Sequence, residues 1–232
     1  MNAPSPQPSA IYSARALSRI QTTLLALLLI FQSTAAIALD FRVDFRESTY
    51  QTQAGDTFSD LLAQHQSETL IQSSVTTGLE NVSTTVYGNG VRRDYSILMS
   101  TTVEIGEEGF YEFQVGTDWG RGGAAALVDN STGLVVSERV ITDDVWWANS
   151  FDHEDVFTTS FNFSEGDSYS LFWVGFEDCC GGSSTIRFSV DGSEFAPLTE
   201  TNFAPFTAVP EPSTAILVGL GLIALTGSRK RN

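Results

Sequence analysis

Apolar and polar side chains alternate with a period of two along several stretches of the chain's second half. Tyr111, Phe113 and Val115 are separated by polar residues, and similar alternation occurs over 157–163 and 185–190. Successive side chains of a β-strand point to opposite faces, so this pattern predicts strands with one buried face. The stretch 169–176 is apolar at most positions, which is typical of a strand buried on both faces.

Segments rich in Gly, Asp, Asn and Ser separate these strands and are typical of hairpin turns. They lie at 107–109, 129–133, 164–167 and 191–192. Short strands at such intervals, with little helix between them, predict a mostly β fold, an antiparallel β-sandwich or jelly roll. We place this domain at 91–200.

The stretch 39–90 is instead rich in Ser, Thr and Gln, and we treat it as a separate N-terminal region. It contains one amphipathic pattern, in which Phe58, Leu61 and His65 fall at helical spacing after the candidate cap Asp56. We expect a short helix there. Residues 201–208 are interpreted as an extended linker after the sandwich.

The first 38 residues have the three-part layout of a secretory signal peptide. Arg15 and Arg19 precede a continuous apolar run at 24–31, and the small-residue pattern Ala36-Ile37-Ala38 follows. Eight residues span about 12 Å as a helix, whereas a bilayer core is about 30 Å thick. We therefore expect cleavage by signal peptidase after Ala38; the alternative is an uncleaved anchor.

The last residues, 209–232, form a second three-part segment. The segment begins with Val209-Pro210-Glu211-Pro212 and continues with an apolar run at 214–227. The basic cluster Arg229-Lys230-Arg231 follows. The prolines favour an extended backbone, and the basic residues favour the cytoplasmic side of a membrane. The apolar run spans only about 21 Å as a helix. We expect a short transmembrane helix that holds the chain transiently; an ordinary tail anchor is the alternative.

This C-terminal layout resembles the PEP-CTERM sorting signal of Gram-negative bacteria that produce exopolysaccharide. The resemblance implies that an exosortase processes the tail, so that the tail is a substrate. It also implies an exported protein that passes through the inner membrane to the cell surface or extracellular matrix.

Charge is distributed unevenly along the 232 residues. Seven arginines stand against 27 acids between Asp40 and Glu200, so this part carries a formal charge of −20. Such a surface repels nucleic acid and anionic lipid, and we predict no nucleic-acid partner. Sixteen Phe and four Trp indicate a packed core.

Cys179 and Cys180 are the only cysteines and are adjacent. Neighbouring Cα atoms lie about 3.8 Å apart, closer than the roughly 4.4–6.8 Å of ordinary disulfides. Gly181 and Gly182 give the backbone the freedom that a vicinal disulfide needs. Export permits such a bond, which would stiffen one loop; intermolecular bridges and free thiols remain alternatives.

The segment 165–192, with its adjacent cysteines, resembles the CCXG group of PEP-CTERM proteins. Residues 101–198 are more distantly similar to protective-antigen-type sandwich domains. Some lectins of that type bind sugar through calcium held by consecutive aspartates. In this chain Asp118 is followed by Trp119, and Asp178 by Cys179, so that aspartate pair is absent.

The candidate ligand or calcium loop combines carboxylates with adjacent tryptophans. Aromatic rings beside acids suit sugar stacking with hydrogen bonds, and carboxylates suit calcium. The alternative is that one tryptophan packs in the core, the other lies on the surface, and the acids are merely solvated. The candidate residues are Asp118, Asp143, Asp144, Trp146, Trp147, Asp152, Asp155 and Asp178.

No catalytic motif is recognisable: His153 lacks the second histidine of a zinc-protease motif, and neither a nucleophile elbow nor a phosphate loop occurs. We predict a protein that is not an enzyme and has no resident cofactor, calcium being the ion that the loop could hold. The leading hypothesis is an exported surface or matrix protein that binds exopolysaccharide. The alternatives are an extracytoplasmic glycan hydrolase and a purely structural matrix component.

Overall fold

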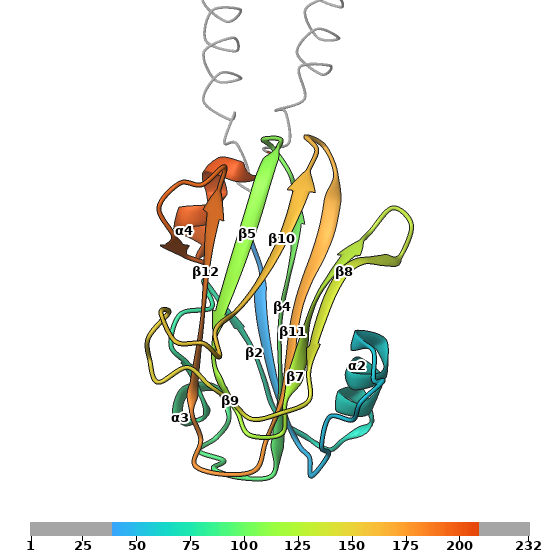
Figure 1. Cartoon of the computed structure of the whole chain (residues 1–232), viewed down its shortest axis with the longest axis vertical. Coiled ribbons are helices and arrows are strands. Elements are labelled where there is room, and N and C mark those ends of the chain that lie inside the picture. Colours follow the sequence, from blue (N-terminus) through green and yellow to red (C-terminus); the bar gives the residue numbers. More distant parts are fainter. Residues whose placement is uncertain (1–38, 209–232) are drawn as a thin grey trace, which may run out of the picture. The chain divides into compact units, whose positions relative to one another are not determined.

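Two antiparallel sheets pack face to face in the computed structural model, which describes residues 39–208 (Figure 1). The larger sheet has six strands in the order β2-β1-β4-β11-β7-β8. These strands are, in chain order, β1 (Phe41–Glu47), β2 (Leu70–Thr76), β4 (Tyr95–Glu104), β7 (Gly123–Asp129), β8 (Leu134–Ile141) and β11 (Ser168–Glu177). The predicted antiparallel β-sandwich is confirmed, while the expected signal-peptide and tail helices lie outside the described residues.

The smaller sheet has the order β10-β5-β12-β13, and β3 pairs with β12 off this path. A separate two-stranded ribbon joins β6 to β9. The strands are β3 (Val82–Ser83), β5 (Gly109–Gly116), β6 (Asp118–Trp119), β9 (Val145–Trp146), β10 (Phe157–Phe163), β12 (Ser183–Val190) and β13 (Ala196–Pro197). The helices are α2 (Phe58–Ser67), α3 (Thr84–Tyr87), α4 (Glu200–Phe203) and the 3-10 turn η1 (Ala204–Phe206).

The core forms where the period-two faces of the two sheets meet. Tyr111, Phe113 and Val115 on β5 are fully buried, and the ring of Phe113 contacts Trp173 of β11 with 6.2 Å between ring centroids. Full burial of each such side chain stabilises the fold by about 1.5–3 kcal/mol. The predicted burial on one face is confirmed for β5. In β12 the apolar face is buried as predicted, but Thr185 and Ser189 on the other face are buried too.

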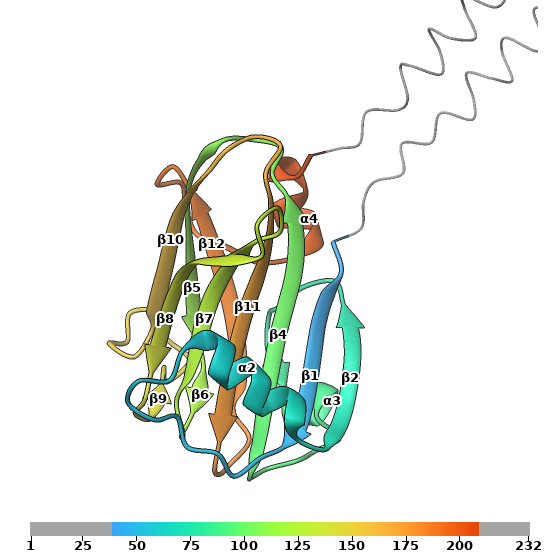
Figure 2. The same cartoon turned by 90° about the vertical axis from the view of Figure 1, so that its right-hand side faces the viewer.

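The second half of β11 is buried on both faces because α2 lies across the outside of the large sheet (Figure 2). Thr57, not the predicted Asp56, caps this helix, and Thr57 and Asp60 form a capping box. His65, a residue of α2, is fully buried, and its Nδ1 lies 2.8 Å from Oγ of Ser96. Burial lowers the pKa of His65 to about 4, so the ring is neutral and packs in the core.

The predicted boundary at residue 90 is corrected by the position of β1. This strand pairs with β2 on one side and β4 on the other, so 39–90 belongs to the sandwich. Phe41, Val43 and Phe45 alternate with polar residues and are buried. The polar composition that hid this pattern comes from β2, an edge strand with largely exposed side chains.

The expected linker at 201–208 is also corrected. Its residues form α4 and η1, and Phe203 is fully buried against Tyr111 and Phe188. The amide of Gly106 donates to the carbonyl of Phe206 at 2.9 Å. Burial of these aromatic rings draws the segment into the domain instead of leaving it extended.

The turn segments divide into two kinds. Residues 129–133 join β7 to β8, which pair as a hairpin, as predicted. Residues 107–109 and 164–167 instead connect strands that belong to different sheets, so they are crossovers and not hairpins. Among residues 39–208, no helix has the length and apolar character needed to cross a membrane.

Candidate functional site

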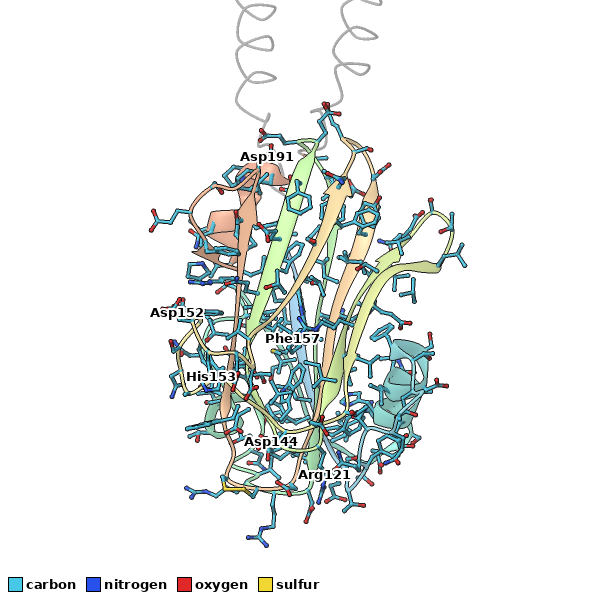
Figure 3. The ribbon with its side chains drawn as sticks, viewed as in Figure 1. Arg121, Asp144, Asp152, His153, Phe157 and Asp191 are labelled. Carbon is cyan, nitrogen blue, oxygen red and sulfur yellow. A yellow bond between two sulfur atoms is a disulfide. The ribbon has the colours of Figure 1, made fainter. Side chains whose placement is uncertain are left out.

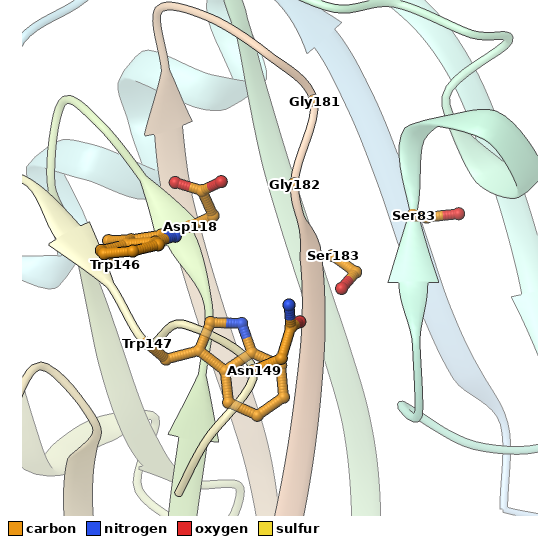
Figure 4. A pocket seen from close by; sticks show the side chains of 8 residues that line it. All are labelled: Ser83, Asp118, Trp146, Trp147, Asn149, Gly181, Gly182 and Ser183. Atoms are coloured by element: carbon orange, nitrogen blue, oxygen red, sulfur yellow. The ribbon is translucent and has the colours of Figure 1, made fainter. Parts of the chain in front are cut away.

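The β6–β9 ribbon places a tryptophan directly opposite a carboxylate. Asp118 pairs with Trp146, and Trp119 pairs with Val145. Since side chains alternate between the faces of a strand, Trp119 and Val145 enter the core and are 1% exposed, whereas Trp146 is 55% exposed. Directly opposite residues have Cβ atoms roughly 5 Å apart. The ribbon therefore presents the indole ring of Trp146 and the carboxylate of Asp118 side by side (Figure 4).

Two glycines leave the space that the indole rings of Trp119 and Trp147 occupy. A Cβ on Gly175 would overlap the ring of Trp119, and a Cβ on Gly116 would overlap the ring of Trp147. Trp147 is 6% exposed and meets Phe151 edge-on, with 5.0 Å between centroids. Of the two adjacent tryptophans, Trp147 is thus in the core and Trp146 is on the surface.

Two residues of the loop after β9 contact Trp146. Oδ2 of Asp155 accepts a hydrogen bond of 3.1 Å from the backbone N–H of Trp146. The imidazole of His153 meets the indole of Trp146 edge-on, with 5.9 Å between ring centroids. His153 and Asp155 therefore position the ribbon residue that carries the exposed ring.

A hollow of about 270 Å³, which we call the Trp146 hollow, opens between the ribbon and the start of β12 (Figure 4). A Cβ on Gly182 would overlap the side chain of Asp118, so only glycine lets the two walls approach this closely. The lining residues are Ser83, Asp118, Trp146, Trp147, Asn149, Gly181, Gly182 and Ser183.

The vicinal disulfide lies at the start of the wall opposite the ribbon. Cys179 and Cys180 are bonded, with Cα atoms 3.8 Å apart. Cys180 and Gly181 both have left-handed backbones, with φ of 75° and 67°, and the amide of Gly181 donates to the carbonyl of Cys179 at 2.9 Å. This tight turn leads directly into the lining residues Gly181 and Gly182.

Glu177 anchors the same loop from inside the protein. Its side chain is 2% exposed, and Oε1 accepts backbone N–H groups of Asp178 and Cys179, both at 2.9 Å. Oε2 accepts the amide of Gly120 at 3.1 Å, which ties the loop to the ribbon's end. Burial raises the pKa of Glu177 to about 7, although these three hydrogen bonds lower it.

Asp118 has a different environment. Burial first, and then the negative charges of Asp144 and Asp178, raise the pKa of its carboxyl group. No hydrogen bond contributes to this shift. Two other predicted site carboxylates, Asp144 and Asp178, therefore lie close enough for their charges to act on Asp118.

The remaining predicted residues lie elsewhere or serve other purposes. Asp143 is exposed and does not line the hollow. Asp152 is exposed in the loop after β9 (Figure 3) and does not line the hollow; its charge acts on Arg187. Arg187 stacks on Phe151, with 3.9 Å from its guanidinium carbon to the ring centroid.

One group of side chains approaches the spacing of a metal site. Ligand atoms of Glu177, Asp178 and Cys179 lie within 4.8 Å of one another. However, both oxygens of Glu177 accept backbone N–H groups, and Cys179 is in the disulfide. Calcium takes six to eight oxygen ligands, so this trio does not fit a calcium ion.

Sequence reasoning missed part of the hollow's lining. Asn149 follows the tryptophan pair with a left-handed backbone, φ 55°, which is a signal for a tight turn but not for a site. Ser83 and Ser183 are 100 positions apart and meet only because β3 pairs with β12. No pattern in the sequence reports such a pairing.

Comparison with known proteins finds the PEP-CTERM protein-sorting motif at residues 208–231. A search of curated proteins finds no match. Among solved structures, the chain is similar to a PA14 sugar-binding domain from an RTX adhesin, at 10% identity, a TM-score of 0.42, and coverage of 71% of this chain and 97% of that one.

Two further structures show similar values. The PA14 domain of the MpAFP antifreeze protein has 15% identity, a TM-score of 0.46, and coverage of 69% and 87%. The epithelial adhesin 9 A domain from Candida glabrata, in complex with Galb1-3GlcNAc, has 11% identity, a TM-score of 0.45, and coverage of 70% and 89%.

The family match lies almost entirely outside the described residues and includes Val209, Pro210, Glu211 and Pro212. Membership of the CCXG group stays a prediction. The motif itself implies export, processing by an exosortase and sorting to the cell surface. The chain is therefore a PEP-CTERM sorting-motif protein whose described part is an antiparallel β-sandwich.

Proposed function

We propose that the β-sandwich is a glycan-binding domain that the sorting motif delivers to the cell surface, with a sugar subsite in the Trp146 hollow. The observation that carries this proposal is the exposed indole of Trp146, set opposite the carboxylate of Asp118. The polymer that a surface protein of this kind meets is exopolysaccharide.

Trp146 is the one tryptophan of the chain with an exposed ring. The chain's three other tryptophans are buried, and a hydrogen bond to Asp155 holds the backbone of Trp146. Stacking an aromatic ring on the apolar face of a sugar ring buries apolar surface and so favours binding. Around it, Asp118, Asn149 and Ser183 offer the hydrogen-bonding groups that sugar hydroxyls need.

The size of the hollow favours a polymer over a small free ligand. Its volume of about 270 Å³ is below the roughly 300–1,000 Å³ of pockets that enclose drug-sized ligands. One sugar unit would occupy the hollow while neighbouring units cross open surface. Affinity would then increase through repeated weak contacts along one chain.

Binding of the full chain to immobilised polysaccharides, with and without calcium, tests this proposal. Trp146→Ala is expected to weaken binding about tenfold or more, the equivalent of about 1.4 kcal/mol. Phe110→Ala is the matched control, because Phe110 is 39% exposed on β5 and does not line the hollow. Equal binding by the two variants, or no binding by the folded protein, would contradict the proposal.

The same assay separates the alternative functions. Release of soluble sugar that one carboxylate substitution abolishes would favour a hydrolase. A folded protein that binds no polysaccharide under either condition would favour a purely structural matrix role.

A further inference from the structure

The Trp146 hollow is negatively charged. None of its eight lining residues is basic, and Asp118 is its one acidic residue. Asp144 and Asp178 add negative charge close enough to raise the pKa of the Asp118 carboxyl group. The surrounding part of the chain carries a formal charge of −20 between Asp40 and Glu200.

Asp118 also has unused hydrogen-bonding capacity. Within residues 39–208, no hydrogen bond is among the causes that shift the pKa of its carboxyl group. Glu177, by contrast, accepts three backbone N–H groups. A half-buried carboxylate without donors is costly, and a ligand that brings a positively charged donor would offset that cost.

From this geometry we propose that the sugar unit bound in the hollow is an amino sugar with a free, protonated amine. This inference rests on the proposed function and names the ligand class. The ammonium donates to the carboxylate of Asp118 while the sugar ring lies on Trp146. Charge-assisted hydrogen bonds are about twice as strong as neutral ones, and an indole face also attracts a cation.

The charge pattern distinguishes this ligand from the other sugar classes. A uronic acid would place its carboxylate among Asp118, Asp144 and Asp178, where like charges repel. A neutral sugar could stack on Trp146 but would leave the carboxylate of Asp118 without a counter-charge. The amine-bearing unit satisfies both features of the hollow.

Binding should depend on pH through Asp118. Because its pKa is raised, the carboxylate of Asp118 takes up a proton at a higher pH than an ordinary aspartate does. The neutral carboxyl group then attracts an ammonium less strongly. The titratable groups that face it are Asp144, Asp178, Glu177 and Tyr95. The backbone of Arg92 lies next to Gly181, but its side chain is exposed and does not line the hollow.

The test uses three tetrasaccharides with one β-1,4-linked backbone, built from glucosamine, N-acetylglucosamine or glucose. Each is titrated into the purified full chain, with and without calcium. We expect the glucosamine tetramer to bind about tenfold or more tightly than the glucose tetramer, as one charged hydrogen bond allows. Asp118→Asn should remove this preference, so that the glucosamine and glucose tetramers bind this variant within about twofold of each other.

Asp143→Asn is the matched control, since it changes the net charge equally but lies outside the hollow. The affinity ratio of the glucosamine and glucose tetramers should stay within about twofold of its value in the unchanged chain, because an exposed charge outside the hollow is screened. Thermal unfolding shows whether each variant is folded.

Equal binding of the three tetramers, or a preference that survives Asp118→Asn, would overturn the amino-sugar inference and leave the proposed function standing. A preference that appears only with calcium would also overturn it. If the folded chain bound none of the tetramers or polysaccharides, both the inference and the proposed function would fail.

Discussion

The two walls of the Trp146 hollow use their acidic residues in opposite ways. On the disulfide loop, Glu177 is buried and all its hydrogen bonds go to the backbone of the protein itself. On the ribbon, Asp118 is only partly buried and faces the hollow beside Trp146. Glu177 stabilises the loop, and in the proposed function the carboxylate of Asp118 meets the ligand. Burial alone does not separate these roles, since it raises the pKa of both groups.

Removing the structural carboxylate should have the largest effect. Glu177→Ala leaves three partly buried backbone N–H groups without their acceptor, and an unsatisfied buried group costs about 1–3 kcal/mol. We expect the free energy of unfolding, measured with urea, to fall by about 3 kcal/mol or more.

Asp118→Asn serves as the comparison for that measurement. It relieves repulsion from Asp144 and Asp178, so stability should stay equal or increase slightly. A Glu177→Ala chain as stable as the Asp118→Asn chain would show that the two walls do not differ in this way.

The pH dependence of stability should follow the same division. The pKa of Glu177 is about 7 in the folded chain, above the ordinary 4.5. Between these values the folded state holds more protons than the unfolded state, so stability falls as pH rises from about 4.5 to about 7. The full shift corresponds to about 3 kcal/mol.

Glu177→Gln should flatten this slope, because the amide does not titrate and its oxygen can still accept N–H groups. Urea unfolding at a series of pH values measures the effect. An unchanged slope in the Gln variant would assign the pH dependence to other groups.

The vicinal disulfide should affect binding more than stability. It joins neighbouring residues, so it closes almost no loop and adds little chain-entropy stabilisation. Replacing Cys179 and Cys180 with Ser should shift the midpoint of thermal unfolding by only a few degrees, about 1 kcal/mol or less. Glycan affinity should fall severalfold, because Gly181 and Gly182 in the hollow's wall follow this turn. A large loss of stability with unchanged affinity would contradict this account.

Sequence alternation predicted the inner faces of β5 and β12, because apolar side chains mark the face of each strand that enters the core. It failed at 39–90, where the edge strand β2 has no fully buried residue and lacks a regular alternation, so the buried pattern of β1 was overlooked. It failed again at 201–208, where burial of Phe203 against residues far away in sequence decides the structure.

The candidate site shows the same limit. The sequence left a division of Trp146 and Trp147 between core and surface as the alternative to a ligand loop, and it did not say which ring would be exposed. The space above Gly116, which only Trp147 can fill, makes that choice. The opposite wall depends on the pairing of β3 with β12, which no local pattern encodes.

The most direct test of glycan binding at Trp146 is to follow the four indole N–H resonances of the full chain by NMR during titration with the tetrasaccharides. A Trp146→Phe variant identifies the Trp146 signal by its loss. The account predicts a saturable shift of that signal, while the buried Trp119 and Trp173 stay in place. A saturable shift of another indole with Trp146 unmoved, or no shift of any indole at saturating sugar, would contradict it.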